Sequence, residues 1–324
     1  MGAPTIRTSD LATQTSRRAL LSLLLVASLS LNAGCLSSTI IPDDGRPLVV
    51  CTTQMVGDFI RRIGGDHFHV HVLMGPDIDP HLYKASPSDI YRMTRAQMIV
   101  YSGLHLEGNL QPALEAMKKT RPTFAVTEDL HDHHQDKLIH LGEDLYDPHI
   151  WHDVALWAQA GEYTAQKLIE LYPEHKDEFE KNWQTYKAEL VQLDHETREQ
   201  LAKLPVKIFV TGHDAFSYFG RTYGLEVHPV QGVSTENEAS VSKINQLVNL
   251  IVEKKVPAIF VESTLNDRNL RALIEGATHR GHRITIGGTL YSDATGPVGS
   301  GAESYEGMIR ANVHTIVNAL QPKS

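Results

Sequence analysis

Cysteine is almost absent from this sequence, with 2 cysteines among 324 residues. Two thiols are too few for a disulfide-built scaffold or for a structural zinc site with four cysteine ligands. Basic residues are also outnumbered: the chain has 30 lysines and arginines and 39 aspartates and glutamates, which gives a formal net charge of -9. Because nucleic-acid phosphates are bound by basic surfaces, this charge balance argues against nucleic acid as a partner.

The apolar run at residues 19–31 is too short for a comfortable transmembrane helix. Basic residues, among them Arg17 and Arg18, precede it, and small residues lead from it to Gly34 and Cys35. A basic region, an apolar run and a small-residue cleavage site are typical of a secretory signal. An uncleaved anchor or an ordinary signal with an incidental cysteine are the alternatives, and the export route, Sec or twin-arginine, stays open.

Gly34-Cys35 resembles the end of a bacterial lipoprotein signal. The resemblance implies a signal peptide over 1–34, lipidation of Cys35 and a tether over 35–47, and hence an extracytoplasmic protein anchored to a membrane. The other cysteine, Cys51, lies in an apolar segment that predicts a buried strand. With Cys35 acylated it has no partner, so we interpret it as a core residue.

Strands and helices alternate along the rest of the chain. This order predicts an α/β fold in which parallel sheets are covered by helices. A helix predicted over 174–204 would be roughly 45 Å long, long enough to connect two lobes. We expect an N-terminal lobe over 48–173, this connecting helix, and a C-terminal lobe over 205–324, with the ligand site in the cleft between them. The expected strands are 48–53, 67–73, 98–101, 123–126, 207–211, 225–229, 258–262 and 283–286.

Histidine is abundant, with 18 histidines in the chain, and this indicates metal binding or pH sensing. Four segments at strand ends or helix starts offer metal ligands, namely Asp77-Ile78-Asp79-Pro80-His81, Asp147-Pro148-His149-Ile150-Trp151-His152-Asp153, Thr211-Gly212-His213-Asp214-Ala215-Phe216 and Leu290-Tyr291-Ser292-Asp293-Ala294. Three imidazoles and one carboxylate would form a compact set of ligands for a divalent ion.

Two choices remain open within these segments. His149 and His152 are three residues apart, so either could face the ion from one side of a helix, and we favour His149. Nearby carboxylates could accept the second ring N–H of the ligand histidines and so set the tautomer. The candidates for this role, which the sequence does not pair with particular histidines, are Asp79, Asp147, Asp214 and Glu262.

These motifs together resemble the metal-binding lipoproteins of bacterial zinc/manganese ABC importers, over essentially the whole chain after the signal. The resemblance implies two α/β lobes bridged by one long helix and one ion in the cleft, bound by His81, His149, His213 and Asp293. Many manganese-binding members have glutamate at the third position, whereas this chain has His213 and is most similar to the TroA-like type. Such a site accepts Zn²⁺ or Mn²⁺.

The segment from Glu128 to Pro148 interrupts the alternation of strands and helices and is rich in acids and histidines. It shows no helical or strand periodicity, so we expect an irregular, mobile loop. Such a loop could be a solvent-exposed acidic loop without a binding role, or it could collect zinc at low affinity near the cleft. Its histidines are His131, His133, His134 and His140.

The function that we expect is capture of an extracytoplasmic metal ion, zinc first and manganese next, and its delivery to an ABC permease with its ATPase subunit. We expect a monomer that is not an enzyme. A zinc-dependent hydrolase is the alternative, because three protein ligands and a water form a catalytic site. Against it, Asp293 would fill the open position and no His-Glu-x-x-His helix occurs. An adhesin or zinc chaperone would share the same site.

Overall fold

The N-terminal half of the fold contains a four-stranded parallel sheet. The structure is a computed structural model that describes residues 2 and 44–321, so the apolar run 19–31 and Cys35 lie outside the described residues. The strands lie in the order β2-β1-β3-β4. The central strands are buried along their whole length, as expected for apolar strands covered on both faces. Their bounds are Leu48–Cys51 for β1, His69–Val72 for β2, Met98–Tyr101 for β3 and Thr123–Ala125 for β4.

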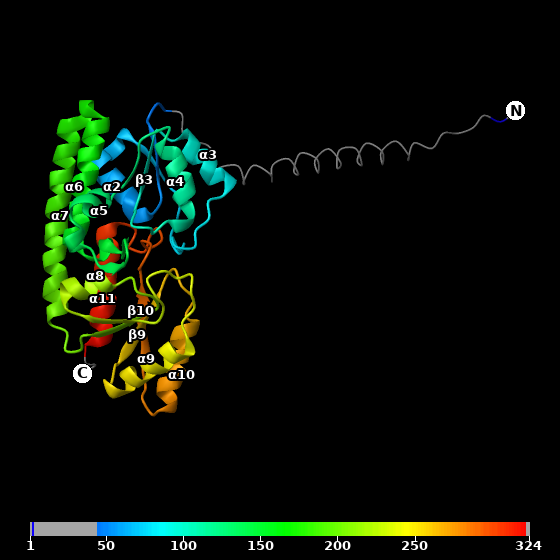
Figure 1. The fold of residues 1–324 in the computed structure, drawn as a ribbon, viewed down its shortest axis with the longest axis vertical. Helices are drawn as coiled ribbons and strands as arrows, with labels where there is room; N and C mark the ends of the chain where they lie inside the picture. The colour runs from blue at the N-terminus through cyan, green and yellow to red at the C-terminus, as the bar shows by residue number, and fades with distance from the viewer. Residues whose placement is uncertain (1, 3–43, 322–324) are drawn as a thin grey trace. The chain divides into compact units, whose positions relative to one another are not determined.

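Helices cover this sheet on both sides (Figure 1). Helix α2 (Gln54–Gly64) follows β1 directly, and the Thr53 side chain accepts a hydrogen bond from the backbone N–H of Val56. Helix α3 (Pro87–Arg95) begins at a capping box formed by Ser86 and Asp89, which ends the irregular segment that carries His81. Helix α4 (Gln111–Lys118) follows the short 3₁₀ turn η2 (Gly108–Leu110) directly.

The acid- and histidine-rich segment is folded, and the expectation of an irregular loop is wrong. It contains α5 (Glu128–His133), the 3₁₀ turn η3 (Gln135–Lys137) and an antiparallel hairpin of β5 (His140–Gly142) and β6 (Leu145–Tyr146). The elements are too short to produce a periodic pattern. The segment is held in place by the side chains of Leu130, Leu138 and Tyr146, which are buried in the main core.

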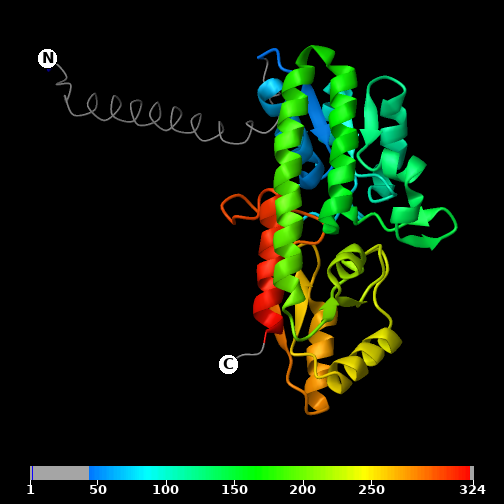
Figure 2. The same cartoon turned by 90° about the vertical axis from the view of Figure 1, so that its left-hand side faces the viewer.

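Two long helices pack side by side along the molecule. After the 3₁₀ turn η4 (Ile150–His152), α6 (Val154–Leu171) leads through η5 (Pro173–His175) to α7 (Lys176–Ala202). The 27 residues of α7 span about 40 Å. A Cβ at Gly161 of α6 would lie 2.5 Å from the Trp183 ring of α7, so this glycine permits the close approach of the pair. In Figure 2, α7 runs beside α6 and then beside α11 in red.

The C-terminal half contains two parallel strand pairs, β7–β8 and β9–β10, with β7 next to β9. Successive side chains of these strands enter different cores, as the pleat requires. Phe209 and Phe260 join the main apolar cluster, whereas Val210 and Ile259 join a second cluster under α9 and α10. The elements are β7 (Ile208–Thr211), α8 (Ser217–Tyr223), β8 (Glu226–Pro229), α9 (Val241–Glu253), β9 (Ala258–Glu262), α10 (Arg268–His279), β10 (Thr285–Leu290) and α11 (Tyr305–Leu320).

The main apolar core continues from one lobe into the other. It includes Phe59 beside the N-terminal sheet, Tyr186 on α7 and Met308 on α11. Helix α11 also reaches the N-terminal lobe, where the Tyr305 N–H donates to Asp58. The predicted α/β class, with two lobes connected by a long helix, is confirmed. Cys51 is buried in the core, as predicted.

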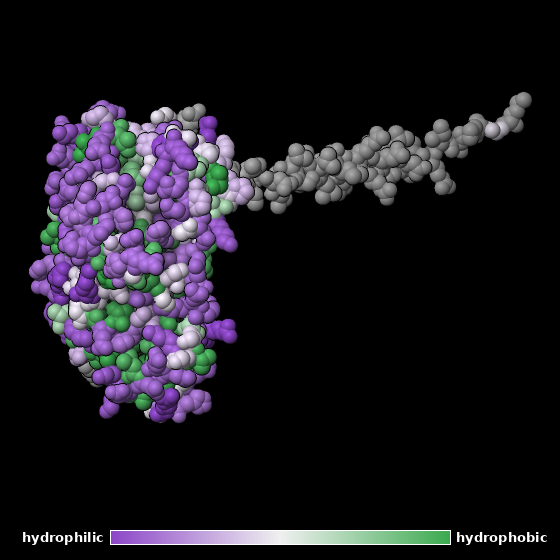
Figure 3. All heavy atoms as spheres, in the orientation of Figure 1, coloured by the Kyte–Doolittle hydropathy of each residue, from purple (hydrophilic) through white to green (hydrophobic). Residues whose placement is uncertain are grey.

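The face shown in Figure 3 is mainly hydrophilic, with apolar side chains scattered among polar ones. None of the helices in the described part of the chain is both long and apolar enough to span a membrane.

Candidate metal centre

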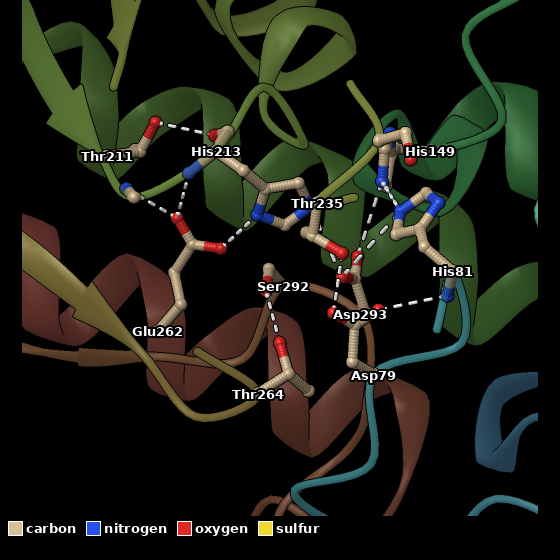
Figure 4. Close-up of polar contacts among 12 residues, drawn as sticks. Asp79, His81, His149, Thr211, His213, Thr235, Glu262, Thr264, Ser292 and Asp293 are labelled. Carbon is tan, nitrogen blue, oxygen red and sulfur yellow. Dashed lines mark hydrogen bonds and ion pairs between the residues drawn. The ribbon is translucent and has the colours of Figure 1, made fainter. Parts of the chain in front are cut away.

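Four predicted ligand residues meet where the two lobes face each other. His81, His149, His213 and Asp293 each offer a ligand atom, and these atoms all lie within 4.8 Å of one another. Within residues 44–321, this is the group of His, Cys, Asp or Glu side chains that could hold a metal ion. All four side chains are buried, and Figure 4 shows them pointing toward a common centre.

The four residues come from connections at the carboxyl ends of strands or just before helices. His81 lies between β2 and α3, His149 just before η4, His213 just after β7 and Asp293 just after β10. Each lobe therefore provides two of them, as expected for a site between two parallel sheets. Two interatomic distances describe the centre of the group. The Nε2 atoms of His81 and His149 are 3.2 Å apart, and Asp293 lies 3.2 Å from Nε2 of His213.

Glu262 at the end of β9 holds His213 in place. One of its carboxylate oxygens accepts hydrogen bonds from the backbone N–H groups of Gly212 and His213, at 2.6 and 2.9 Å. The other accepts from Nδ1 of the His213 ring at 2.5 Å. Because the carboxylate occupies Nδ1, the Nε2 atom of His213 is the one that faces Asp293 (Figure 4).

Asp147 supports His149 in the same way. Its Oδ1 accepts from the backbone N–H of His149 at 2.9 Å and from ring Nδ1 at 2.7 Å. His149 Nε2 then lies 3.3 Å from Asp293. Two of the predicted carboxylate partners, Asp147 and Glu262, thus contact histidine rings. A third, Asp214, accepts from the Ser217 hydroxyl instead of from a histidine.

His81 is held through its backbone. Its N–H donates to Oδ1 of Asp79 at 2.9 Å, and its carbonyl oxygen accepts from Asn109 at 3.0 Å. Among the described residues, no carboxylate accepts a hydrogen bond from its Nδ1. Asp79, the remaining predicted partner, therefore contacts the main chain of a ligand histidine and not its ring.

His152 does not join the group of four. It is the last residue of the 3₁₀ turn η4, and its ring is bonded outside the group of four. Its Nε2 lies 3.0 Å from the carbonyl oxygen of Ser292, which also accepts from Trp151 at 2.7 Å. Because a carbonyl can only accept, the Nε2 of His152 is the donor. His152 and Trp151 thus hold the residue before Asp293, a role that sequence spacing alone does not reveal.

The charges in the centre favour a cation. Burial alone would lower the pKa of His149, but the carboxylates of Asp147 and Asp293 outweigh burial and raise that pKa to about 9. The pKa of His213 is raised well above its usual range, since Glu262 and Asp293 outweigh burial there too. Burial would raise the pKa of Asp293, yet the neighbouring His213 and His149 hold it well below its ordinary value. Burial lowers the pKa of His81 to about 3, so this ring is neutral.

Polar atoms without partners mark the centre itself. His213 Nε2 and both carboxylate oxygens of Asp293 are buried and have no hydrogen-bond partner. Because its pKa is raised, the metal-free His213 ring carries a proton on Nε2 beside the Asp293 carboxylate. A bound metal ion would replace this proton as the positive charge between the two side chains. Three imidazole nitrogens and a carboxylate are donors that suit zinc and also accept manganese.

The histidines of the acid-rich segment do not belong to this group of ligands. His131 Nδ1 pairs with Asp132 at 2.8 Å, and His134 lies 3.7 Å from Asp129. The ring of His140 packs edge-on against Tyr146. Within the described part of the chain, His131, His133, His134 and His140 do not form a group whose ligand atoms could share one ion.

Comparisons with known proteins agree with this geometry. The family described as "Zinc-uptake complex component A periplasmic" matches residues 49–319. The chain is 40% identical over 308 residues to the manganese-binding lipoprotein MntA of Bacillus subtilis (strain 168), covering 94% of this chain and 100% of that protein. It is 40% identical over 279 residues to the zinc-binding protein TroA of Treponema pallidum (strain Nichols), covering 86% and 90%.

The fold agrees as well. The solved structure of the periplasmic zinc binding protein TroA from Treponema pallidum superposes with a TM-score of 0.83 at 39% identity, covering 86% of this chain and 100% of that one. The predicted resemblance to metal-binding components of zinc/manganese importers is confirmed, and none of these relatives is named as a hydrolase. Since the family model spans nearly all described residues, the chain belongs to the family of zinc-uptake complex component A, periplasmic.

Proposed function

We propose that this protein captures one divalent metal ion outside the cytoplasm and delivers it to an ABC permease that works with its own ATPase subunit. Membership of the zinc-uptake family and the similarity to MntA and TroA support this function. The protein acts as a monomer and binds the metal as cargo, without catalysing a reaction.

The ligands are His81, His149, His213 and Asp293. The observation that carries the proposal is their convergence around buried atoms that lack hydrogen-bond partners. The ion is enclosed by two ligands from each lobe, so binding stabilises the arrangement in which the lobes face each other. Four protein ligands leave no evident position for a catalytic water, which disfavours the hydrolase alternative.

Zinc binds more tightly than manganese in this proposal. Zinc follows manganese in the Irving–Williams order of rising affinity, and imidazole nitrogen suits zinc while manganese prefers oxygen. Three of the four ligands are nitrogen donors. Tighter zinc binding still permits manganese as the physiological cargo where manganese is more abundant, and relatives named for each metal exist.

Release depends on local movement of ligand segments. The apolar core runs from the N-terminal sheet through α7 to α11, and separating the lobes as rigid bodies would break it. Movement of the connections that carry the ligands exposes far less apolar surface. Contact with the permease therefore acts on these connections.

The remaining organisation follows the lipoprotein pattern. Residues 1–34 are a signal peptide, Cys35 is lipidated, and 35–47 form a tether to the membrane. The lobes span 48–173 and 205–324, and 174–204 is the connecting segment. Residues 131–140 add no second high-affinity ion, and their histidines serve at most as weak zinc contacts.

The test is metal analysis of protein purified without added metal, followed by competition between zinc and manganese. We expect one ion per molecule and displacement of manganese by equimolar zinc. The cargo is identified by measuring uptake of radioactive zinc and manganese in cells that lack the protein and in the same cells after the gene for the protein has been restored. Protein that binds neither ion, or binding without any effect on uptake, would contradict the proposal.

A further inference from the structure

The His81 segment differs from the other ligand segments in how it is secured. Residues 73–86 contain no helix or strand and expose Ile78 (40%) and Leu82 (48%) to solvent. His81 is 6% exposed, whereas His149 and His213 are 0% exposed. Because His81 is the most exposed of the three ligand histidines and, among the described residues, no carboxylate accepts from its Nδ1, its segment is the one that can move with least disruption.

One hydrogen bond connects this segment to the opposite lobe. The hydroxyl of Thr235 donates to Oδ2 of Asp79 at 2.6 Å, while Oδ1 of the same carboxylate accepts from the backbone of His81 (Figure 4). Thr235 is largely buried, in the connection between β8 and α9. A single carboxylate thus links the main chain of a ligand residue to the other lobe.

The connection that carries Thr235 is itself anchored beside His213. The backbone N–H of Gln231 donates to the carbonyl of Gly212 at 2.9 Å, and Gly232 accepts from Asp214 at 3.3 Å. The Asp79–Thr235 bond therefore joins the His81 segment to the segment that positions His213. These two ligands come from different lobes, so the bond connects the two sides of the site.

We propose that the Asp79–Thr235 hydrogen bond is a latch that holds the His81 segment over the bound ion and sets the rate at which the ion leaves. The inference rests on the function proposed above and adds a positioning residue, Thr235, to it. When the bond opens, Oδ2 of Asp79 gains water, the His81 backbone loses its fixed acceptor, and His81 can swing from the ion. The other three ligands keep their own supports.

Removal of one hydroxyl tests the latch. Thr235→Val keeps the branched shape but leaves Asp79 Oδ2 without a donor. Because hydrogen bonds to charged groups are among the stronger ones, we expect zinc release roughly tenfold faster, with little change in the association rate. Release is followed by stopped flow after mixing zinc-loaded protein with a chromogenic chelator, at chelator concentrations where the rate no longer depends on chelator.

Two variants serve as controls. Thr235→Ser keeps the hydroxyl and should release zinc at nearly the wild-type rate. Thr278→Val, at an exposed threonine of α10 whose hydroxyl bonds to Ile274, should also match the wild type. Asp79→Ala should release zinc faster, and adding Thr235→Val to it should have no further effect, because both changes remove the same bond.

The outcomes separate the latch from a structural role and from the proposed function. Fast release by Thr235→Val, rescued by serine and absent in the Asp79→Ala background, supports the latch. Release at the wild-type rate, or additive effects of the two changes with a lowered melting temperature, overturns it. If Thr235→Val does not fold, Thr235→Ala is read by the same criteria. A wild-type protein that binds no zinc or manganese overturns the proposed function itself.

Discussion

His213 in the C-terminal lobe and His81 in the N-terminal lobe are held in different ways. In the C-terminal lobe, Glu262 bonds the ring and backbone of His213 and the backbone of Gly212, all at the ends of two adjacent strands. In the N-terminal lobe, His81 lies in an irregular segment and its carboxylate partner reaches only its backbone. A ligand whose ring and backbone are both bonded to a carboxylate is prearranged for the ion, whereas a ligand held only through its main chain can leave and return. Tight capture and timely release thus depend on different residues.

Among the changes that test this comparison, removing the His213 side chain should lower zinc affinity the most. We expect His213→Ala to weaken zinc binding on the order of a hundredfold, about 2.7 kcal/mol, because a prearranged ligand is lost and the ion keeps only three protein ligands. Competition with a chelator of known affinity measures the change. His81→Ala should cost less, since water can reach that position more easily. His314→Ala, at an exposed histidine of α11, is the control, and a larger loss at His81 would reverse the comparison.

Lowering the pH should weaken zinc binding by a comparable amount over two pH units. The metal needs imidazoles without protons on Nε2, and the pKa of His149 is about 9 in the metal-free protein. Binding should therefore release about one to two protons per ion, and affinity should rise between about pH 6 and 8. Isotherms with chelator-buffered zinc at several pH values give this slope. An affinity that does not depend on pH would contradict the histidine ligands.

The same pKa values fix the sign of a stability effect in the metal-free protein. His149 has a folded pKa of about 9, above the ordinary 6.5, so its contribution to stability is complete below pH 6.5. That contribution is lost as the pH rises through about 9. The lowered pKa of Asp293 contributes stability above its ordinary value of 3.8, and so stays constant in this range. The melting temperature of the metal-free protein should fall as the pH rises toward 9. Bound zinc should make this decrease smaller.

Glu262→Gln should have a smaller effect than the loss of His213. Glutamine can still accept from the two backbone N–H groups, but its NH₂ would replace the oxygen that faces Nδ1 of His213. Two donors would then meet, so the ring must change tautomer or turn, and we expect roughly tenfold weaker zinc binding. Glu226→Gln is the matched control, because Glu226 pairs with the partly exposed His228 in the same lobe. If the two changes weakened zinc binding equally, Glu262 would not be positioning His213 for the ion.

Replacing the four histidines of the acid-rich segment should have the smallest effect. With His131, His133, His134 and His140 changed to Gln, we expect one zinc per molecule and an affinity within about twofold of the wild type. Substitution is preferred to deletion, because Leu138 is buried and the Ile139 N–H donates to Tyr218 across the lobes. A large loss of affinity in the cleft would show that this segment belongs to the main site.

Local patterns in the sequence were sufficient for the order of strands and helices and for the residues that could be ligands. Long helices such as α7 produce a clear period of buried side chains, and short apolar runs mark the buried strands. The segment with α5 and the β5–β6 hairpin escaped prediction, because its elements are too short for periodicity and depend on burial of single residues such as Leu130. Metal binding by the four converging side chains stays a prediction.

By itself the sequence determined the fold class, the family and the four residues that converge, because these depend on local periodicity and on short motifs at strand ends. Tertiary structure alone decided that Glu262 supports His213 and that Asp79 bonds to Thr235. Glu262 is 49 residues from His213, and Thr235 is 156 residues from Asp79, so no local pattern links either pair. The role of His152 was decided in the same way, since its partner, the carbonyl of Ser292, belongs to the other lobe. Such contacts form only when packing of the two lobes brings distant segments together, and side-chain geometry then selects among groups of similar chemistry.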